Sequence, residues 1–309
     1  MKETEKFLQP LSKLMHRRSF MSKAGMAGMT AAAATLAGSL PARANGWNDH
    51  DRDDVDNTSG DTAQEVFTAA LIAEDLASTF YYNGLIGPVI MDPALAGPGG
   101  TATNVTSAGN AGNVNYLQAA LSEEIAHADL LRALTGGTSA SKDPVQMFYL
   151  PAGTFDTLAA FTGVLDALEN AFIGAYLNAT IEFAEMAADS KAGIRHQKDA
   201  TGKQLHSTDL EYYAQVAAAI MGIESEHRVL GRVISNTNPA NQLNYEQTDG
   251  LTSVYNGTAS AVVALTPFLT PGAGKTAYSL QVALQHASSV SLPTTGGLPP
   301  APVVKKIRW

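Results

Sequence analysis

The chain has 309 residues, of which 45% are hydrophobic and 16% are charged, a composition typical of a soluble globular protein with one sizeable core. It contains no cysteine, which excludes disulfides, thiolate metal sites, iron–sulfur clusters and a cysteine nucleophile. The formal net charge is −9, and no basic run interleaved with aromatic residues is present, so we expect no nucleic-acid partner. Any bound metal must be held by oxygen and imidazole ligands.

The first 44 residues have the layout of an export signal. A basic segment containing Arg17 and Arg18 precedes an uncharged stretch over residues 24–40, which ends in a small-residue segment at Ala44. The segment resembles a twin-arginine signal, with His16 where Ser or Thr is usual. The uncharged stretch is short and rich in Ala and Gly, so we expect no stable membrane span after cleavage. We therefore expect twin-arginine export to the periplasm or outside the cell.

Four long helices follow a polar linker that covers residues 45–60. Apolar residues recur at the 3.6-residue period of a helix, and strand-like alternation is absent from this part of the chain. We expect Asp61 or Thr62 to cap the first helix, and Gly87 and Pro88 to end it. The predicted helices span about residues 61–86, 114–134, 155–191 and 208–234.

The connections divide the predicted domain from a weaker C-terminal part. Residues 138–153 contain two prolines and are long enough to cross the end of a helical bundle. We assign residues 61–235 to the bundle and residues 236–309 to an extension. Within the extension, residues 251–265 favour a short helix, residues 275–287 favour a helix or a strand, and the end is a Pro/Gly-rich tail.

Acidic residues lie in the middle of the apolar stripes of these helices. Glu74 is central to the stripe of the first helix, and Glu169 is central to that of the third. The second and fourth helices each carry a Glu-x-x-His pair, whose members project from one side of the helix about a turn apart. These pairs are Glu124 with His127 and Glu224 with His227.

An internal duplication supports reading these residues as one set. The two Glu-x-x-His pairs are 100 positions apart, and the two single glutamates are 95 positions apart. The same shift of 95 places Tyr81 on Tyr176, and the shift of 100 places Arg132 on Arg232. The sequence therefore predicts one helical hairpin used twice.

The order Glu, Glu-x-x-His, Glu, Glu-x-x-His resembles the ligand set of the ferritin-like di-metal carboxylate superfamily, which includes bacterioferritin, rubrerythrin and manganese catalase. The export signal and the C-terminal extension are more similar to desiccation-related members. The resemblance implies an all-α, ferritin-like four-helix bundle with a long crossover between its second and third helices. It implies two iron or two manganese ions, bound by Glu74, Glu124, His127, Glu169, Glu224 and His227.

The physical case for a metal centre stands beside the resemblance. Four carboxylates directed into one core would repel one another, and each would lose hydration worth several kcal/mol. Two divalent cations balance the four negative charges, and two neutral imidazoles complete the set. Carboxylates can bridge ions roughly 3.5 to 4 Å apart. Oxygen ligands with two imidazoles suit iron or manganese better than copper or structural zinc.

Further residues near the motifs have open roles. Tyr81 and Tyr176 are expected to be core tyrosines, with a hydrogen bond toward the cluster or electron relay as the alternative. Glu123 and Glu226 are out of phase with the apolar stripes and are expected in solvent, although a slip of one position would exchange their roles with the glutamates of the motifs. Three aspartates are candidates for orienting the imidazoles, and four other histidines are expected to face solvent. They are Asp75, Asp129 and Asp166, and His50, His196, His206 and His286.

Three functions fit this reading. The first is an oxidoreductase that protects against oxidative stress by reacting with peroxide or dioxygen, and the second is iron binding or storage in a homo-oligomer. The third is a stress protein that uses its metals only for stability. The sequence leaves open whether the protein is an enzyme.

Overall fold

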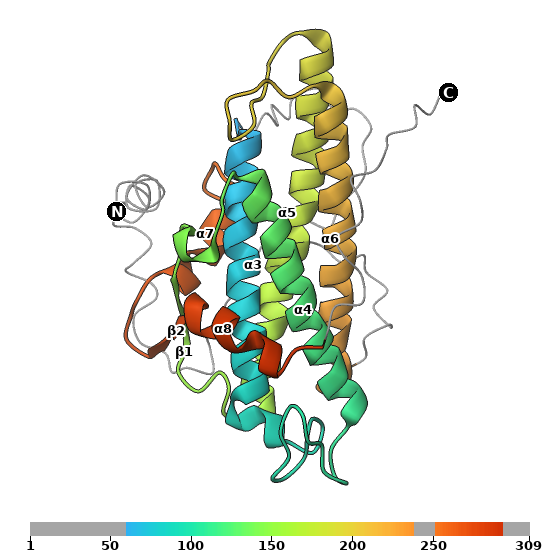
Figure 1. Cartoon of the computed structure of the whole chain (residues 1–309), viewed down its shortest axis with the longest axis vertical. Helices are drawn as coiled ribbons and strands as arrows, with labels where there is room; N and C mark the ends of the chain where they lie inside the picture. Colours follow the sequence, from blue (N-terminus) through green and yellow to red (C-terminus); the bar gives the residue numbers. More distant parts are fainter. Residues whose placement is uncertain (1–59, 238–250, 293–309) are drawn as a thin grey trace, which may run out of the picture.

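The computed structural model describes residues 60–237 and 251–292 (Figure 1). The predicted signal and linker, apart from residue 60, lie outside the described residues, as does much of the predicted extension. The described chain is mostly helical, with two pairs of long helices and a small two-stranded sheet. The domain boundaries at residues 44, 60 and 235 stay predictions.

All four predicted long helices are present. The first pair is α3, Ala63–Ile86, with α4, Ala111–Leu134, and the second pair is α5, Leu158–Ala192, with α6, Ser207–Ile234. Within each pair the two helices pack along one another, and smaller contacts join α3 to α5 and α4 to α6. The four helices run along the long axis of the molecule, and α5 and α6 extend furthest at one end (Figure 1).

Capping side chains set the helix starts. Thr62 accepts a hydrogen bond from the backbone N of Glu65 at 3.2 Å, and Glu65 accepts one from the backbone N of Thr62 at 2.8 Å, which makes a capping box at the start of α3. Asn110 caps α4, so this helix begins three residues earlier than predicted. Thr157 caps α5, which begins three residues later than predicted.

The connection before α5 departs from the predicted all-α fold. It contains β1, Met147–Pro151, which pairs antiparallel with β2, Lys275–Ser279, in a register that places Met147 opposite Ser279. The strand was missed because its five residues are too short a run to show a period. Two of them, Phe148 and Leu150, are fully buried.

The described part of the extension folds against the side of the helix pairs that carries the sheet (Figure 1). Helix α7, Ala261–Leu269, begins ten residues later than predicted and contains Pro267, and α8, Leu280–His286, follows β2 directly. Residues 275–287 therefore contain both a strand and a helix. Short 3₁₀ turns occupy Pro88–Met91, Ala140–Lys142 and Ala287–Ser289.

Two buried acids accept hydrogen bonds from the backbone of the segment before α7 and hold it in position. Asp61 accepts hydrogen bonds from the backbone N of Tyr255 and of Asn256, both at 2.8 Å, and Glu182 of α5 accepts one from Val254 N at 2.9 Å. Burial, together with the neighbouring Asp61 carboxylate, raises the pKa of Glu182 to about 9. At neutral pH Glu182 is therefore a carboxylic acid rather than a carboxylate.

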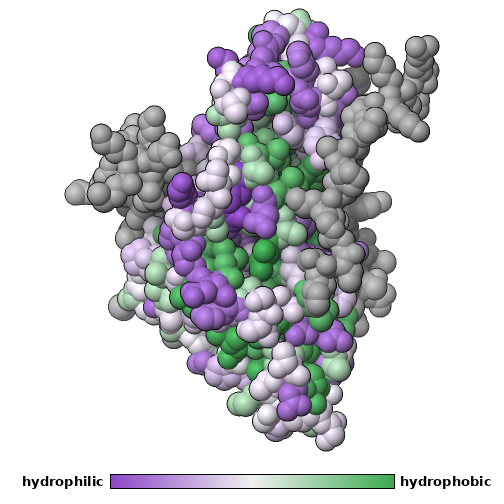
Figure 2. Space-filling view, in the orientation of Figure 1, coloured by the Kyte–Doolittle hydropathy of each residue, from purple (hydrophilic) through white to green (hydrophobic). Residues whose placement is uncertain are grey.

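One described helix, α5, is long and apolar enough to be a candidate membrane span by length and composition. Half of its most apolar window is buried within the protein, and the core helix of a soluble protein passes the same test. Figure 2 shows hydrophilic residues gathered over the end of the molecule where α5 and α6 are joined.

Candidate metal centre

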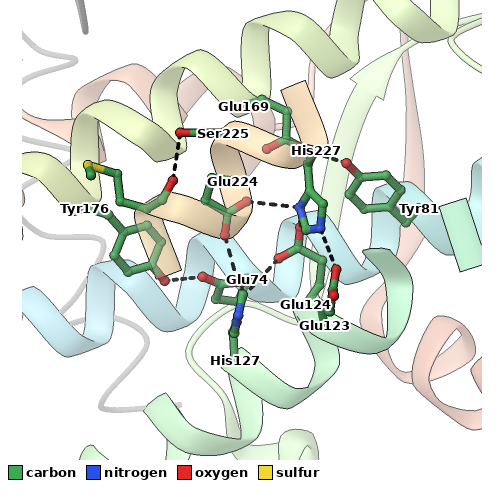
Figure 3. A network of polar contacts seen from close by, with 11 residues as sticks. Glu74, Tyr81, Glu123, Glu124, His127, Glu169, Tyr176, Glu224, Ser225 and His227 are labelled. Atoms are coloured by element: carbon green, nitrogen blue, oxygen red, sulfur yellow. Dashed lines mark hydrogen bonds and ion pairs between the residues drawn. The ribbon is translucent and has the colours of Figure 1, made fainter. Parts of the chain in front are cut away.

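The six residues predicted as metal ligands come together between the four long helices (Figure 3). Each single glutamate comes from the first helix of a pair, and each Glu-x-x-His motif comes from the second. Five of the six side chains are at most 2% exposed, whereas the His127 side chain is 13% exposed. The apolar stripes that place these residues in the core were correctly identified from the sequence.

The six residues form two overlapping groups of potential ligands. Within each group, one ligand atom per residue lies within 4.8 Å of all the others. Both groups contain Glu124 and Glu224, the glutamates of the two Glu-x-x-His motifs. One group adds Glu74 and His127, and the other adds Glu169 and His227. The geometry thus describes two adjacent sites that share two carboxylates.

The two imidazoles direct the same nitrogen at the shared carboxylates. His127 Nδ1 lies 3.3 Å from Glu74 Oε2 and 3.6 Å from Glu224 Oε1. His227 Nδ1 lies 3.0 Å from Glu124 Oε1 and 3.3 Å from Glu224 Oε2. An Nδ1 atom with its lone pair free would be a ligand in each site.

Two tyrosines cross between the helix pairs. Tyr81 of α3 donates a hydrogen bond to Glu169 Oε1 of α5 at 2.6 Å, and Tyr176 of α5 donates one to Glu74 Oε1 of α3. Both tyrosines are buried, as the core interpretation expected, and both bond to the cluster, as the alternative expected. Each holds the single glutamate of the other pair in position.

The electrostatics of the cluster's own side chains favour bound protons. Burial and the charge of Glu124 raise the pKa of Glu74, and burial and the charge of Glu224 raise that of Glu169. Burial alone would raise the pKa of Glu124 too, but the neighbouring Glu74 carboxyl and the charge of His227 hold it below its ordinary value. Burial opposes the charged imidazoles, but the surrounding carboxylates raise the pKa of both histidines.

Several carboxylate oxygens of the cluster have no hydrogen-bond donor among the residues that the structure describes. They are both oxygens of Glu124, Glu169 Oε2 and Glu224 Oε1. A buried polar atom without a partner typically costs about 1–3 kcal/mol, and more when it is charged. Cations between these oxygens would remove that cost, so the residues present fit bound metal ions.

Metal binding is expected to release protons and to tighten as the pH rises. Glu74, Glu169 and both histidines have raised pKa values, so each keeps its proton to a higher pH than it ordinarily would, and each must lose that proton to offer a lone pair to an ion. Calorimetric titration with Mn²⁺ in buffers of different ionisation enthalpy, at about pH 6 and about pH 8, measures the protons released. A binding heat that is independent of the buffer would contradict this prediction.

The three aspartates suggested as orienting acceptors contact arginines instead. Arg132 donates from Nε to Asp143 Oδ2 at 2.7 Å, and its other nitrogens bond to Asp75 and Asp129. Asp166 lies 3.7 Å from Arg232. The described contacts place none of these three acids on an imidazole, because each carboxylate lies beside a guanidinium. The matching positions of Arg132 and Arg232 were the only sequence signal for this arrangement.

Glu123 has a role that the sequence analysis missed. Its side chain is 43% exposed, yet Oε2 lies 2.9 Å from Nε2 of the fully buried His227. Its position out of phase with the apolar stripe places it at the rim of the site rather than in open solvent. Glu226 is exposed, as expected.

The remaining histidines, where described, lie outside the cluster. His196, His206 and His286 are exposed, as expected, and His50 falls outside the described residues.

Comparisons of the chain with protein-family models, with curated proteins and with solved structures found no match.

Proposed function

We propose that the chain is an exported, ferritin-like four-helix bundle that binds two iron or two manganese ions and uses them in redox chemistry on peroxide or dioxygen. The observation that carries the proposal is the pair of overlapping ligand groups, which share Glu124 and Glu224 in a fully buried core. Burying a carboxylate without solvent or hydrogen-bond donors is costly. Four such carboxylates between four helices are therefore not expected from acids placed by chance.

The two ligand groups correspond to two ion positions. Glu74 and His127 would hold one ion, Glu169 and His227 the other, and Glu124 and Glu224 both. Two bound redox-active ions supply two electrons at one place, which is what reduction of a peroxide bond requires. Oxygen ligands with one imidazole for each ion are suited to iron and to manganese.

The chain's own groups prepare the site for small substrates. Tyr81 and Tyr176 fix the orientation of Glu169 and Glu74, because each hydroxyl bonds to one carboxylate oxygen and leaves the other available to a cation. The surrounding core limits the entry of water. Among the six residues, only His127 has a side chain that is more than 2% exposed. The site is therefore most open to solvent at the ion position that His127 would help to bind.

The functional test uses metal-loaded protein. Protein loaded with iron or manganese is expected to consume hydrogen peroxide, and metal-free protein is expected to oxidise added ferrous iron in the presence of dioxygen. Glu124→Ala and His227→Ala should abolish both activities, because each removes a ligand of the cluster. Unchanged turnover in both variants would refute the proposal, and Glu226→Ala is the matched control on the exposed face of α6.

A purely structural role of the metals is the second candidate, favoured by the carboxylate oxygens that have no donor. At about 100 times Kd each ion adds about 2.7 kcal/mol of stability, so two ions raise the melting temperature by roughly 10–20 °C. Such a rise without reaction toward peroxide, dioxygen or ferrous iron supports this candidate. Light scattering tests the storage alternative, since a shell of many subunits would favour it.

The proposed location follows from the sequence signal alone. Export by twin-arginine machinery moves folded proteins, which would allow the ions to be loaded before transport. Fractionation of cells that express the full chain tests this part. Lys replacements of Arg17 and Arg18 should retain the protein in the cytoplasm.

A further inference from the structure

The two halves of the site supply matching ligands but differ just outside them. Glu123, the residue before Glu124 in α4, contacts His227 Nε2 at 2.9 Å. The shift of 100 positions that places Glu124 on Glu224 places Glu123 on Ile223 in α6. The His127 half of the site therefore has the apolar Ile223 at the position where the His227 half has the carboxylate of Glu123.

The contacts of the two imidazoles show this difference. Nδ1 of each ring faces the shared carboxylates, as described above. For Nε2 of His127, no carboxylate lies within ion-pair distance in residues 60–237 and 251–292. The His127 side chain is also 13% exposed, whereas His227 is fully buried.

A carboxylate behind a ligating imidazole has two effects on metal binding. It keeps the proton on the far nitrogen, which leaves the near nitrogen with its lone pair toward the metal. It also makes the ring a stronger donor and fixes its orientation. Loss of such an acceptor typically weakens metal affinity 10- to 100-fold.

We propose that Glu123 makes the two ion positions unequal, so that the ion held by Glu169 and His227 binds first and more tightly. The ion held by Glu74 and His127 binds second and exchanges more readily, since its imidazole is unsupported and more exposed. This inference rests on the proposed two-ion centre and adds the order of filling. Glu123 acts through His227, which makes it a positioning residue.

The test is a titration of metal-free, full-length protein with Mn²⁺, followed by calorimetry and by the electron paramagnetic resonance signal of free Mn²⁺. The wild-type protein is expected to show two steps that differ at least about tenfold in affinity. Glu123→Gln keeps an acceptor oxygen but loses the charge, and Glu123→Ala loses both. The tight step should weaken in the order wild type, Gln, Ala, by up to about 100-fold, with the second step unchanged.

A gain of binding complements this loss. Ile223→Glu places a carboxylate at the matching position of α6 and should tighten the second step toward the first. A general structural effect of residue 123 could not produce this result. Glu226→Gln, which changes an exposed acid of α6, should leave both steps unchanged. Circular dichroism of the metal-free variants checks that each is folded.

The outcomes separate this inference from the proposed function. A wild-type protein that binds no ion refutes the two-ion centre itself. Two ions bound with equal affinity, or a Glu123→Ala variant in which both steps weaken equally or neither weakens, overturn the inference and leave the centre standing. Should the Glu123 variants fail to fold, an Ile223→Glu variant with an unchanged second step would overturn it as well.

Discussion

Glu224→Ala abolishes binding of both ions, whereas Glu74→Ala leaves one ion bound. The difference is expected because Glu224 belongs to both ligand groups and Glu74 belongs to one. Removing Glu224 takes a ligand from each ion and leaves the two cations with one negative charge fewer to balance them. Elemental analysis of purified protein should show about two ions per chain in the wild type, about one in Glu74→Ala and none in Glu224→Ala.

Two further variants make this result specific. Glu124→Ala should match Glu224→Ala, since Glu124 is also shared, and Glu169→Ala should match Glu74→Ala. Glu226→Ala is the control, because it removes an acid two residues from Glu224 that lies on the exposed face. A Glu224→Ala protein that still binds one ion at full affinity would show that the carboxylate is not shared.

Glu182→Gln raises the free energy of unfolding at pH 8 and flattens its dependence on pH. The folded protein holds Glu182 protonated up to a pKa of about 9, whereas the unfolded chain loses this proton near the ordinary value of 4.5. A raised pKa contributes stability that is fully present below the unfolded value and is lost as the pH rises through the folded value. The loss between these limits is on the order of a few kcal/mol.

Glutamine removes this loss because its amide is neutral at every pH. It retains an oxygen for the Val254 backbone N and offers an N–H group toward Asp61. Urea denaturation at several pH values between about 5 and about 9 measures the difference. Glu211→Gln, which changes an exposed acid of α6, should follow the wild-type curve. Parallel curves for wild type and Glu182→Gln would contradict the prediction.

The parts that were predictable from the sequence are those that depend on local periodicity. Glu74 and Glu169 stood out because an acid in an apolar stripe is costly without a partner. The i, i+3 spacing of each Glu-x-x-His pair then placed two ligands on one helix face. The long helices were found for the same reason, with errors of a few residues where Asn110 or Thr157 supplied a cap that periodicity does not register.

The parts that were missed depend on contacts between distant segments. Strand β1 is stabilised by pairing with β2, more than 120 residues later, so no local pattern could reveal it. Asp75 was a candidate for orienting an imidazole, but the turn of α3 directs it to Arg132 instead. Glu123 was assigned to solvent by its helical phase, although a side chain at the rim of a helix pair can reach the neighbouring helix.

The crossed tyrosines make the two helical hairpins mutually dependent. A polypeptide that contained α3 and α4 alone would carry Tyr81 without the Glu169 that it bonds to, and Glu74 without the Tyr176 that holds it. A separate hairpin of this kind could complete its site only by joining a second one, with each tyrosine reaching into the other molecule. Fusing two such hairpins into one chain turns an encounter between molecules into a folding step, which no longer depends on protein concentration.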